Sequence, residues 1–227
     1  MKIKTLSKLL SDRESSRTVV LATNMHNGEE RLIYPTKDDQ NDFIIKSAIE
    51  AVHLDQSTTI TTDTGPIFLH VFNPPLQMIL IGAVHISQPL ATMATLAGYQ
   101  VTVVDPRRAF LSEERFPNIN IRMEWPDEAL QILAPNARTA VVALTHDPKL
   151  DDPALKIALQ SKAFYIGALG SKKTHESRKK RMLESGIGSE DFRRIRGPVG
   201  LNIGAHSPSE IAVSILAEIT QALRAEK

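Results

Sequence analysis

From Leu76 onward, short apolar runs alternate with longer amphipathic stretches, a pattern that predicts alternating strands and helices. Met78–Ile81 is apolar throughout, as is typical of a parallel strand buried on both faces. The next stretch has apolar residues at helical spacing, with Ser87 as its predicted N-cap and Gly98 at its end. The same rhythm predicts further strands at Val101–Val104, Ile119–Met123, Ala140–Leu144 and Phe164–Leu169, and helices at Trp125–Leu133, Pro153–Lys162 and Lys173–Ser185.

The last helix has the clearest start signal. Ser207 and Glu210 form a capping-box pattern, and Pro208 stands at the first helical position. The isoleucines that follow at helical spacing could face either the core or a partner. Repeated strand–helix units with short connections predict an α/β fold over residues 76–227, with a Rossmann-like, doubly wound parallel sheet.

Residues 1–73 have a different pattern and are predicted to form a small α+β N-terminal domain. Thr18–Thr23 and Ile67–Phe72 have strand composition, and Asp42–Val52 has helical spacing. Asn73-Pro74-Pro75 then interrupts the pattern, because proline cannot continue a strand ladder, and this segment is the predicted linker.

Composition narrows the functional classes. The 227 residues are 42% hydrophobic and 23% charged, with a net charge of +1, so no global field favours nucleic acid or a membrane as partner. The chain has no cysteine, which excludes disulfides, thiolate metal ligands and cysteine nucleophiles. No apolar run reaches the roughly 20 residues of a membrane span, and the N-terminus does not resemble a secretory signal. We therefore expect a cytoplasmic protein.

Candidate binding residues follow the predicted strands, because ligands of open α/β sheets bind beyond the carboxyl ends of the strands. Polar groups and glycines gather at these ends and before the final helix. The candidates are Gly82, Ala83 and His85 after the first strand, Asp105 and Arg107 after the second, His146 after the fourth, Gly170, Ser171, Lys172 and Lys173 after the fifth, and Gly204 before the last helix.

The first glycine turn is an incomplete dinucleotide fingerprint. Val84 and Ser87 stand where the G-x-G-x-x-G pattern has its second and third glycines. Asp105 has the spacing of an acid that accepts ribose hydroxyls, whereas Arg107 beside it suits a phosphate. These residues alone leave both ligands open.

The second glycine turn, Gly170-Ser171-Lys172-Lys173, offers free amides, a hydroxyl and two ammonium groups to an anion. Lysines at a helix start oppose the helix dipole, which favours an anionic ligand over a structural role. By contrast, Arg178–Arg181 is interpreted as a solvated basic helix face. His85, His146 and His175 lack metal-ligand spacing, and no catalytic constellation is recognisable, so neither a metal site nor a catalytic residue is predicted.

Five segments together resemble the accessory proteins of xanthine dehydrogenase and carbon monoxide dehydrogenase, the XdhC/CoxI family. They cover about two-thirds of the chain, from about Pro75 to the C-terminus. The segments are ILIGAVHISQPLA, VTVVDPRRAFLSEERFP, LTHDPKLDDPAL, YIGALGSKKTHESRKKRM and GPVGLNIGAHSPSEIAVSILAEI. Full-length relatives carry a cysteine motif in their N-terminal part, which this chain lacks.

The resemblance implies a chaperone that binds molybdenum cofactor, as molybdopterin or its dinucleotide form, and delivers it to a molybdenum hydroxylase apoenzyme. The binding residues would be the candidates at the strand ends. A homodimer is also implied, and a cysteine desulfurase or cofactor-biosynthesis protein is a further implied partner. On this basis the chain is a non-catalytic accessory protein. One alternative is an NAD(P)-dependent oxidoreductase that uses the same sheet, and another is a structural adaptor that binds the dehydrogenase and no small ligand.

Overall fold

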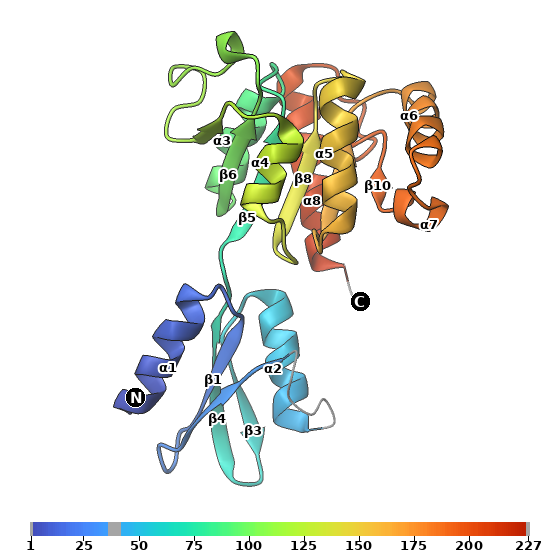
Figure 1. The fold of residues 1–227 in the computed structure, drawn as a ribbon. Coiled ribbons are helices and arrows are strands. Elements are labelled where there is room, and N and C mark those ends of the chain that lie inside the picture. The colour runs from blue at the N-terminus through green and yellow to red at the C-terminus, as the bar shows by residue number, and fades with distance from the viewer. Residues whose placement is uncertain (1, 36–41, 226–227) are drawn as a thin grey trace. The chain divides into compact units, whose positions relative to one another are not determined.

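The computed structural model describes residues 2–35 and 42–225 and divides the chain into two compact units, before and after the Pro74–Pro75 bond. Figure 1 shows both units. The division into functional domains at residues 1–73 and 76–227 stays a prediction.

The N-terminal unit contains an antiparallel sheet with the order β2-β1-β4-β3. One face of this sheet packs against α2, through a core that includes Val20, Leu69 and Ile45. Asp42 caps α2, since its carboxylate accepts from the Ile44 amide at 2.8 Å. The elements are α1 (Ile3–Glu14), β1 (Val19–Asn24), β2 (Glu30–Ile33), α2 (Phe43–Leu54), β3 (Thr58–Thr62) and β4 (Gly65–Phe72).

The sequence pattern did not predict α1, β2 and β3. In α1 the only buried apolar residue is Leu9, so most of the helix shows no stripe that a pattern search would find. β3 is an edge strand made of four threonines and one isoleucine, and none of its residues is fully buried. Such elements are held by their neighbours in the sheet rather than by their own apolar pattern.

In the C-terminal unit six strands form a parallel sheet in the order β10-β9-β8-β5-β6-β7. This order confirms the predicted doubly wound, Rossmann-like fold. The strands are β5 (Leu76–Ile81), β6 (Tyr99–Val104), β7 (Asn120–Arg122), β8 (Thr139–Ala143), β9 (Tyr165–Ala168) and β10 (Ile195–Arg196). The helices are α3 (Ser87–Leu96), the 3-10 turn η1 (Arg108–Phe110), α4 (Pro126–Leu133), α5 (Pro148–Gln160), α6 (Lys172–Glu184), α7 (Ser189–Phe192) and α8 (Pro208–Arg224).

Helices cover both faces of this sheet, as Figure 1 shows. Met78 and Leu80 of β5 face α3 and α8, while Ile79 and Ile81 face α4 and α5. Burial on both faces explains why the stretch Met78–Ile81 of β5 is apolar at four successive positions. In α8, Ile215 and Ile219 are fully buried, so these isoleucines face the core and not a partner.

Two local predictions are corrected, and two short elements are added. Ser87 does not cap α3; it is the first helical residue, and its hydroxyl donates to the Gly82 carbonyl. Helix α5 begins at Pro148 and not at Pro153, because Asp147 caps it and proline suits its first position. The elements α7 and β10 were not predicted, since four and two residues are too short to show a period.

Candidate functional site

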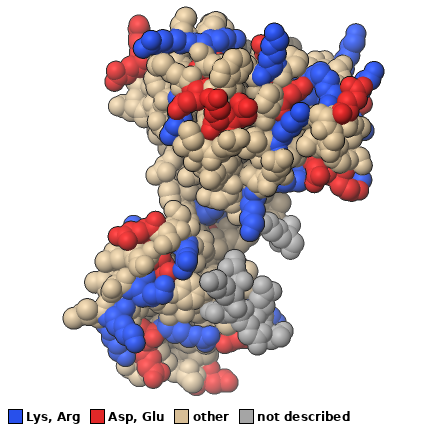
Figure 2. Space-filling view, viewed as in Figure 1, with Lys and Arg blue, Asp and Glu red and all other residues tan. Residues whose placement is uncertain are grey.

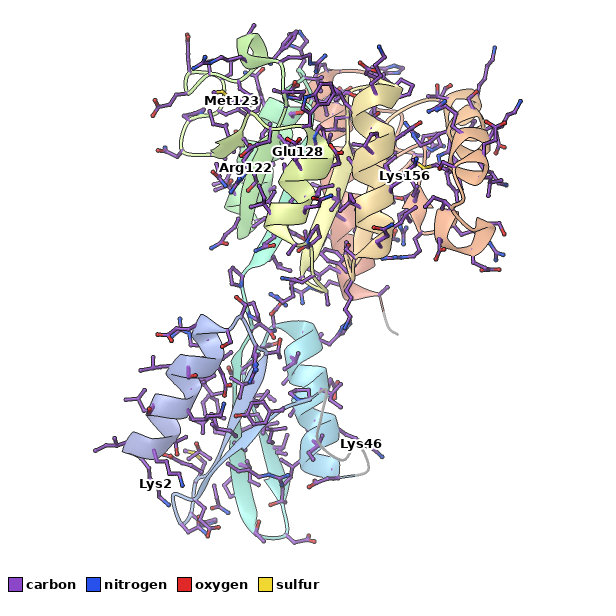
Figure 3. The ribbon with its side chains drawn as sticks, in the orientation of Figure 1. Lys2, Lys46, Arg122, Met123, Glu128 and Lys156 are labelled. Atoms are coloured by element: carbon purple, nitrogen blue, oxygen red, sulfur yellow. The ribbon has the colours of Figure 1, made fainter. Side chains whose placement is uncertain are left out.

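The carboxyl end of the sheet brings together the turns that follow β5, β6 and β8. Gly82 donates its amide to the Val104 carbonyl at 2.7 Å, and Leu144 donates to the Ile81 carbonyl at 2.9 Å. The Asp105 amide donates to the carbonyl of Arg122 at 3.0 Å. Arg122 and Met123 mark this end of β7 in Figure 3. The candidate residues on these turns therefore lie together at the carboxyl end of the sheet.

Gly82 is required by its surroundings. Its φ is +106°, and a Cβ built there would lie 2.4 Å from the Thr145 methyl carbon. Only glycine tolerates both the dihedral angle and the contact. Val84, which replaces the second glycine of the dinucleotide pattern, is half-buried against the core. The turn is thus shaped mainly by packing against the β8 turn.

The carboxylate of Asp105 accepts hydrogen bonds from other groups of the chain. It is fully buried, and its Oδ2 accepts from the Ala83 amide at 2.8 Å and from Arg107 Nη2 at 2.7 Å. Its Oδ1 accepts from Arg107 Nε and from the Arg107 amide, both at 2.9 Å. Burial alone would raise the pKa of Asp105, but the hydrogen bonds from Arg107 and Ala83 outweigh it and leave that pKa lowered.

This arrangement changes the meaning of the Asp105–Arg107 pair. In dinucleotide enzymes the acid after the second strand accepts hydrogen bonds from ribose hydroxyls. Here the two oxygens of that acid already accept four hydrogen bonds within the chain. Asp105 therefore orders the turn after β5, and Arg107 neutralises the buried charge.

The turns after β8 and β9 carry the exposed polar groups. His146 is exposed and has a φ of +63°, in the left-handed region. Ser171 caps α6, accepting from the Thr174 amide at 3.1 Å. Lys172 and Lys173 are the exposed first residues of α6, and neither pairs with an acidic group among residues 2–35 and 42–225. Two uncompensated cations at a helix N-terminus are well suited to an anionic group.

His85 and Gly204 are exposed, and no contact ties either of them to the other candidates in the described part of the chain. Gly170 is strained for any other residue, since its φ is +142° and a Cβ would lie 2.9 Å from Thr174 Cβ. The structure thus joins Gly82, Ala83, Asp105 and Arg107 directly, and sets Gly170–Lys173 at the end of β9, with β8 between that strand and β5. Positive and negative side chains are interspersed on the face seen in Figure 2.

The family is decided by residues 78–219, which match the model described as the XdhC Rossmann domain. The chain belongs to the XdhC family. The matched range runs from β5 to α8 and so contains every candidate residue of the site. Within residues 2–35 and 42–225, no helix is long and apolar enough to cross a membrane.

Two curated relatives carry informative names. A protein named as a probable xanthine dehydrogenase subunit, from Bacillus subtilis (strain 168), is 32% identical over 209 residues, which is 92% of this chain and 58% of that protein. The molybdenum cofactor insertion chaperone PaoD, from Escherichia coli (strain K12), is 32% identical over 148 residues, which is 65% of this chain and 40% of that protein. This XdhC-family chain therefore spans about half the length of these relatives.

A solved structure shares the fold. The crystal structure of a xanthine dehydrogenase from Bacillus halodurans superposes with a TM-score of 0.69 at 24% identity, covering 99% of this chain and 65% of that one. This likeness shows the fold of the XdhC-family chain alone.

Sequence reasoning missed two buried charged residues of the site. Arg178, interpreted above as part of a solvated face, has a side chain only 2% exposed, so that interpretation was wrong. Asp151 on α5 is equally buried, at 1%, and bonds to Thr145 at the end of β8. A basic helix gives no sign of which cation turns inward, because the burial depends on an acid supplied by another helix.

Proposed function

We propose that this chain binds molybdenum cofactor at the carboxyl end of its parallel sheet and assists insertion of the cofactor into a molybdenum hydroxylase of the xanthine or carbon monoxide dehydrogenase type. The observation that carries the proposal is membership of the XdhC family, together with a relative named for molybdenum cofactor insertion. The apoenzyme is then the partner that receives the cofactor.

The donor groups fit such a ligand, which carries phosphate. Ser171, Lys172 and Lys173 begin α6, where free amides and a positive helix end favour an anion. The turn of Gly82 and Ala83 precedes the second helix start at the same edge. His85, His146 and Gly204 are exposed and free to meet the rest of the ligand. When bound, the cofactor supplies molybdenum redox chemistry to the receiving enzyme; the residues of this chain bind, orient and release it.

A binding role also agrees with the state of Asp105. A dehydrogenase that used this sheet would need that carboxylate for ribose hydroxyls, but its oxygens are taken up by Ala83 and Arg107. The arrangement therefore favours cofactor binding over NAD(P)-dependent hydride transfer.

Replacing both Lys172 and Lys173 with alanine is expected to weaken binding of isolated molybdenum cofactor by roughly ten- to a hundredfold, because two charge-assisted contacts are lost. Stability should not fall, since the two lysines oppose the α6 dipole. The measurement is equilibrium binding under anaerobic conditions.

The matched control is the double variant Lys179→Ala and Lys180→Ala, which removes the same charge two turns along the same helix. It should bind the cofactor as the unaltered protein does. Absence of cofactor binding by the unaltered protein would contradict the proposal, and micromolar affinity for NADH or NADPH in its place would indicate a dehydrogenase.

A further inference from the structure

Helix α6, which carries the two lysines, is attached to the rest of the unit largely by charged groups. Only Arg178 and Met182 on it are buried. Arg181 Nε and Nη2 donate to the carboxylate of Asp152 on α5, at 2.6 and 3.1 Å. Most helices dock through an apolar stripe, whereas α6 uses arginines that reach α5 and the sheet. In Figure 1, α6 lies beside α5 on the β10 side of the sheet, and its Met182 belongs to the same core cluster as residues of α4 and α5.

Arg178 connects α6 to the end of β9. Its Nη2 donates to the Leu169 carbonyl at 2.9 Å, immediately before the Gly170 turn. The same nitrogen lies 3.7 Å from Asp151 Oδ2. This side chain therefore touches both the start of the lysine-bearing turn and an acid on α5.

Asp151 connects α5 to the end of β8. Its Oδ1 accepts from the Thr145 hydroxyl at 2.7 Å and from the Thr145 amide at 3.3 Å. Thr145 Oγ1 in turn accepts from the Asp147 amide at 3.0 Å, and its methyl carbon fills the space beside Gly82. Through Thr145, the acid is linked to the turns after β8 and β5.

This pair is poorly suited to a purely stabilising role. Both side chains are almost fully buried, yet Nε and Nη1 of Arg178 and Oδ2 of Asp151 have no hydrogen-bond partner within residues 2–35 and 42–225. Burial raises the pKa of Asp151 despite its contacts with Thr145 and Arg178. A pair of apolar residues of similar volume often stabilises a core as well as or better than a buried ion pair.

We propose that Asp151 and Arg178 are positioning residues, which hold the turns after β5, β8 and β9 in one arrangement for the ligand. Asp151 sets Thr145, and Thr145 packs on Gly82. Arg178 fixes the Leu169 carbonyl and with it the direction from which Lys172 and Lys173 enter the site. The ligand in question is the one named under the proposed function, on which this part of the inference depends.

The first test is residue-resolved amide hydrogen exchange on the full chain, which requires no ligand. Arg178→Met should speed exchange of the Asp147, Thr174 and Gly82 amides about tenfold or more. In the unaltered protein, local opening of these turns has to break the contacts of Arg178, and the variant has no such contacts to break. Exchange at Val141 and Val142 in the centre of β8 should change much less. Arg181→Met, on the same helix with the same loss of charge, should speed these three amides much less, because the Arg181–Asp152 pair contacts none of the three turns.

Asp151→Asn provides a second variant in case Arg178→Met does not fold, because it keeps the shape and an acceptor for Thr145. Because the Asn side chain would turn an NH2 donor, in place of Oδ2, toward Arg178 Nη2, the variant should speed exchange of the Asp147 and Gly82 amides, with a smaller effect at Thr174, whose turn is held by Arg178. Uniform acceleration over the whole sheet, or acceleration equal to that of Arg181→Met, would overturn the positioning role.

Binding of isolated molybdenum cofactor separates this inference from the proposed function. If the unaltered protein binds the cofactor, Arg178→Lys should recover part of the affinity that Arg178→Met loses, since it restores one donor to the Leu169 carbonyl. If the unaltered protein binds none, the proposed function fails, while the exchange pattern still supports or overturns the positioning role. Equal affinities in all variants would overturn positioning and leave the proposed function standing.

Discussion

Gly82→Ala is expected to destabilise the C-terminal unit by about 3 kcal/mol, through overpacking and an unfavourable backbone angle together. The added Cβ would lie 2.4 Å from the Thr145 methyl carbon, and Thr145 cannot withdraw without breaking its bonds to Asp151 and Asp147. The residue would also need a φ of +106°, which L-residues other than glycine rarely adopt. Urea denaturation followed by fluorescence of Trp125, the single tryptophan, measures the loss in this unit.

Two controls separate the contact from the backbone angle. Gly98→Ala places a Cβ in open space at a φ of +87°, so it should cost only about 1 kcal/mol. Thr145→Ser removes the methyl carbon and keeps the hydroxyl, so in combination with Gly82→Ala it should recover the contact part of the loss. If Gly82→Ala lowers the free energy of unfolding no more than Gly98→Ala does, the close packing described between Gly82 and Thr145 is wrong.

Asp105→Ala is expected to cost about 3 kcal/mol, because it leaves the Ala83 amide and the Arg107 guanidinium without their buried acceptor. Asp105→Asn should cost less, since one acceptor oxygen remains. Both variants should weaken cofactor binding as well, since the turn after β5 loses the bond that orders it. Equilibrium denaturation and cofactor binding are measured on the same preparations.

The cost of Asp105→Asn should also depend on pH. The pKa of Asp105 is lowered in the folded protein from the ordinary value of 3.8, so the folded state holds the carboxylate more firmly than the unfolded chain does. Its stabilisation is complete above the unfolded pKa and is lost as pH falls through the lower folded pKa. The difference from the unaltered protein should therefore be constant near neutral pH and shrink below pH 3.8.

The compared quantity is the difference in the free energy of unfolding between Asp105→Asn and the unaltered protein. If it stayed constant down to about pH 2, folding would not lower the pKa of Asp105, which would contradict the hydrogen bonds described for it.

The strands of the parallel sheet were predictable because burial on both faces forces apolar residues at every position. Met78–Ile81 and Ala140–Leu144 have that composition, and both form central strands. The edge strands β2, β3 and β10 escaped prediction for the converse reason, whereas the edge strand β7 was predicted. β3 lies at the edge of its sheet with its threonines largely exposed, and β10 is two residues long, so neither needs the composition of a core strand.

The alternation of strands and helices and the glycine turns at Gly82 and Gly170 could be read from the sequence, because each follows from local preferences of the backbone. The sequence also showed two lysines at the start of α6. The roles of Asp105 and Arg178 became visible only in the folded chain. The first could have faced a ribose and the second could have faced solvent. Their roles depend on Ala83, Arg107 and Asp151, which the fold brings to them, and a charged side chain buries itself only where such partners meet it.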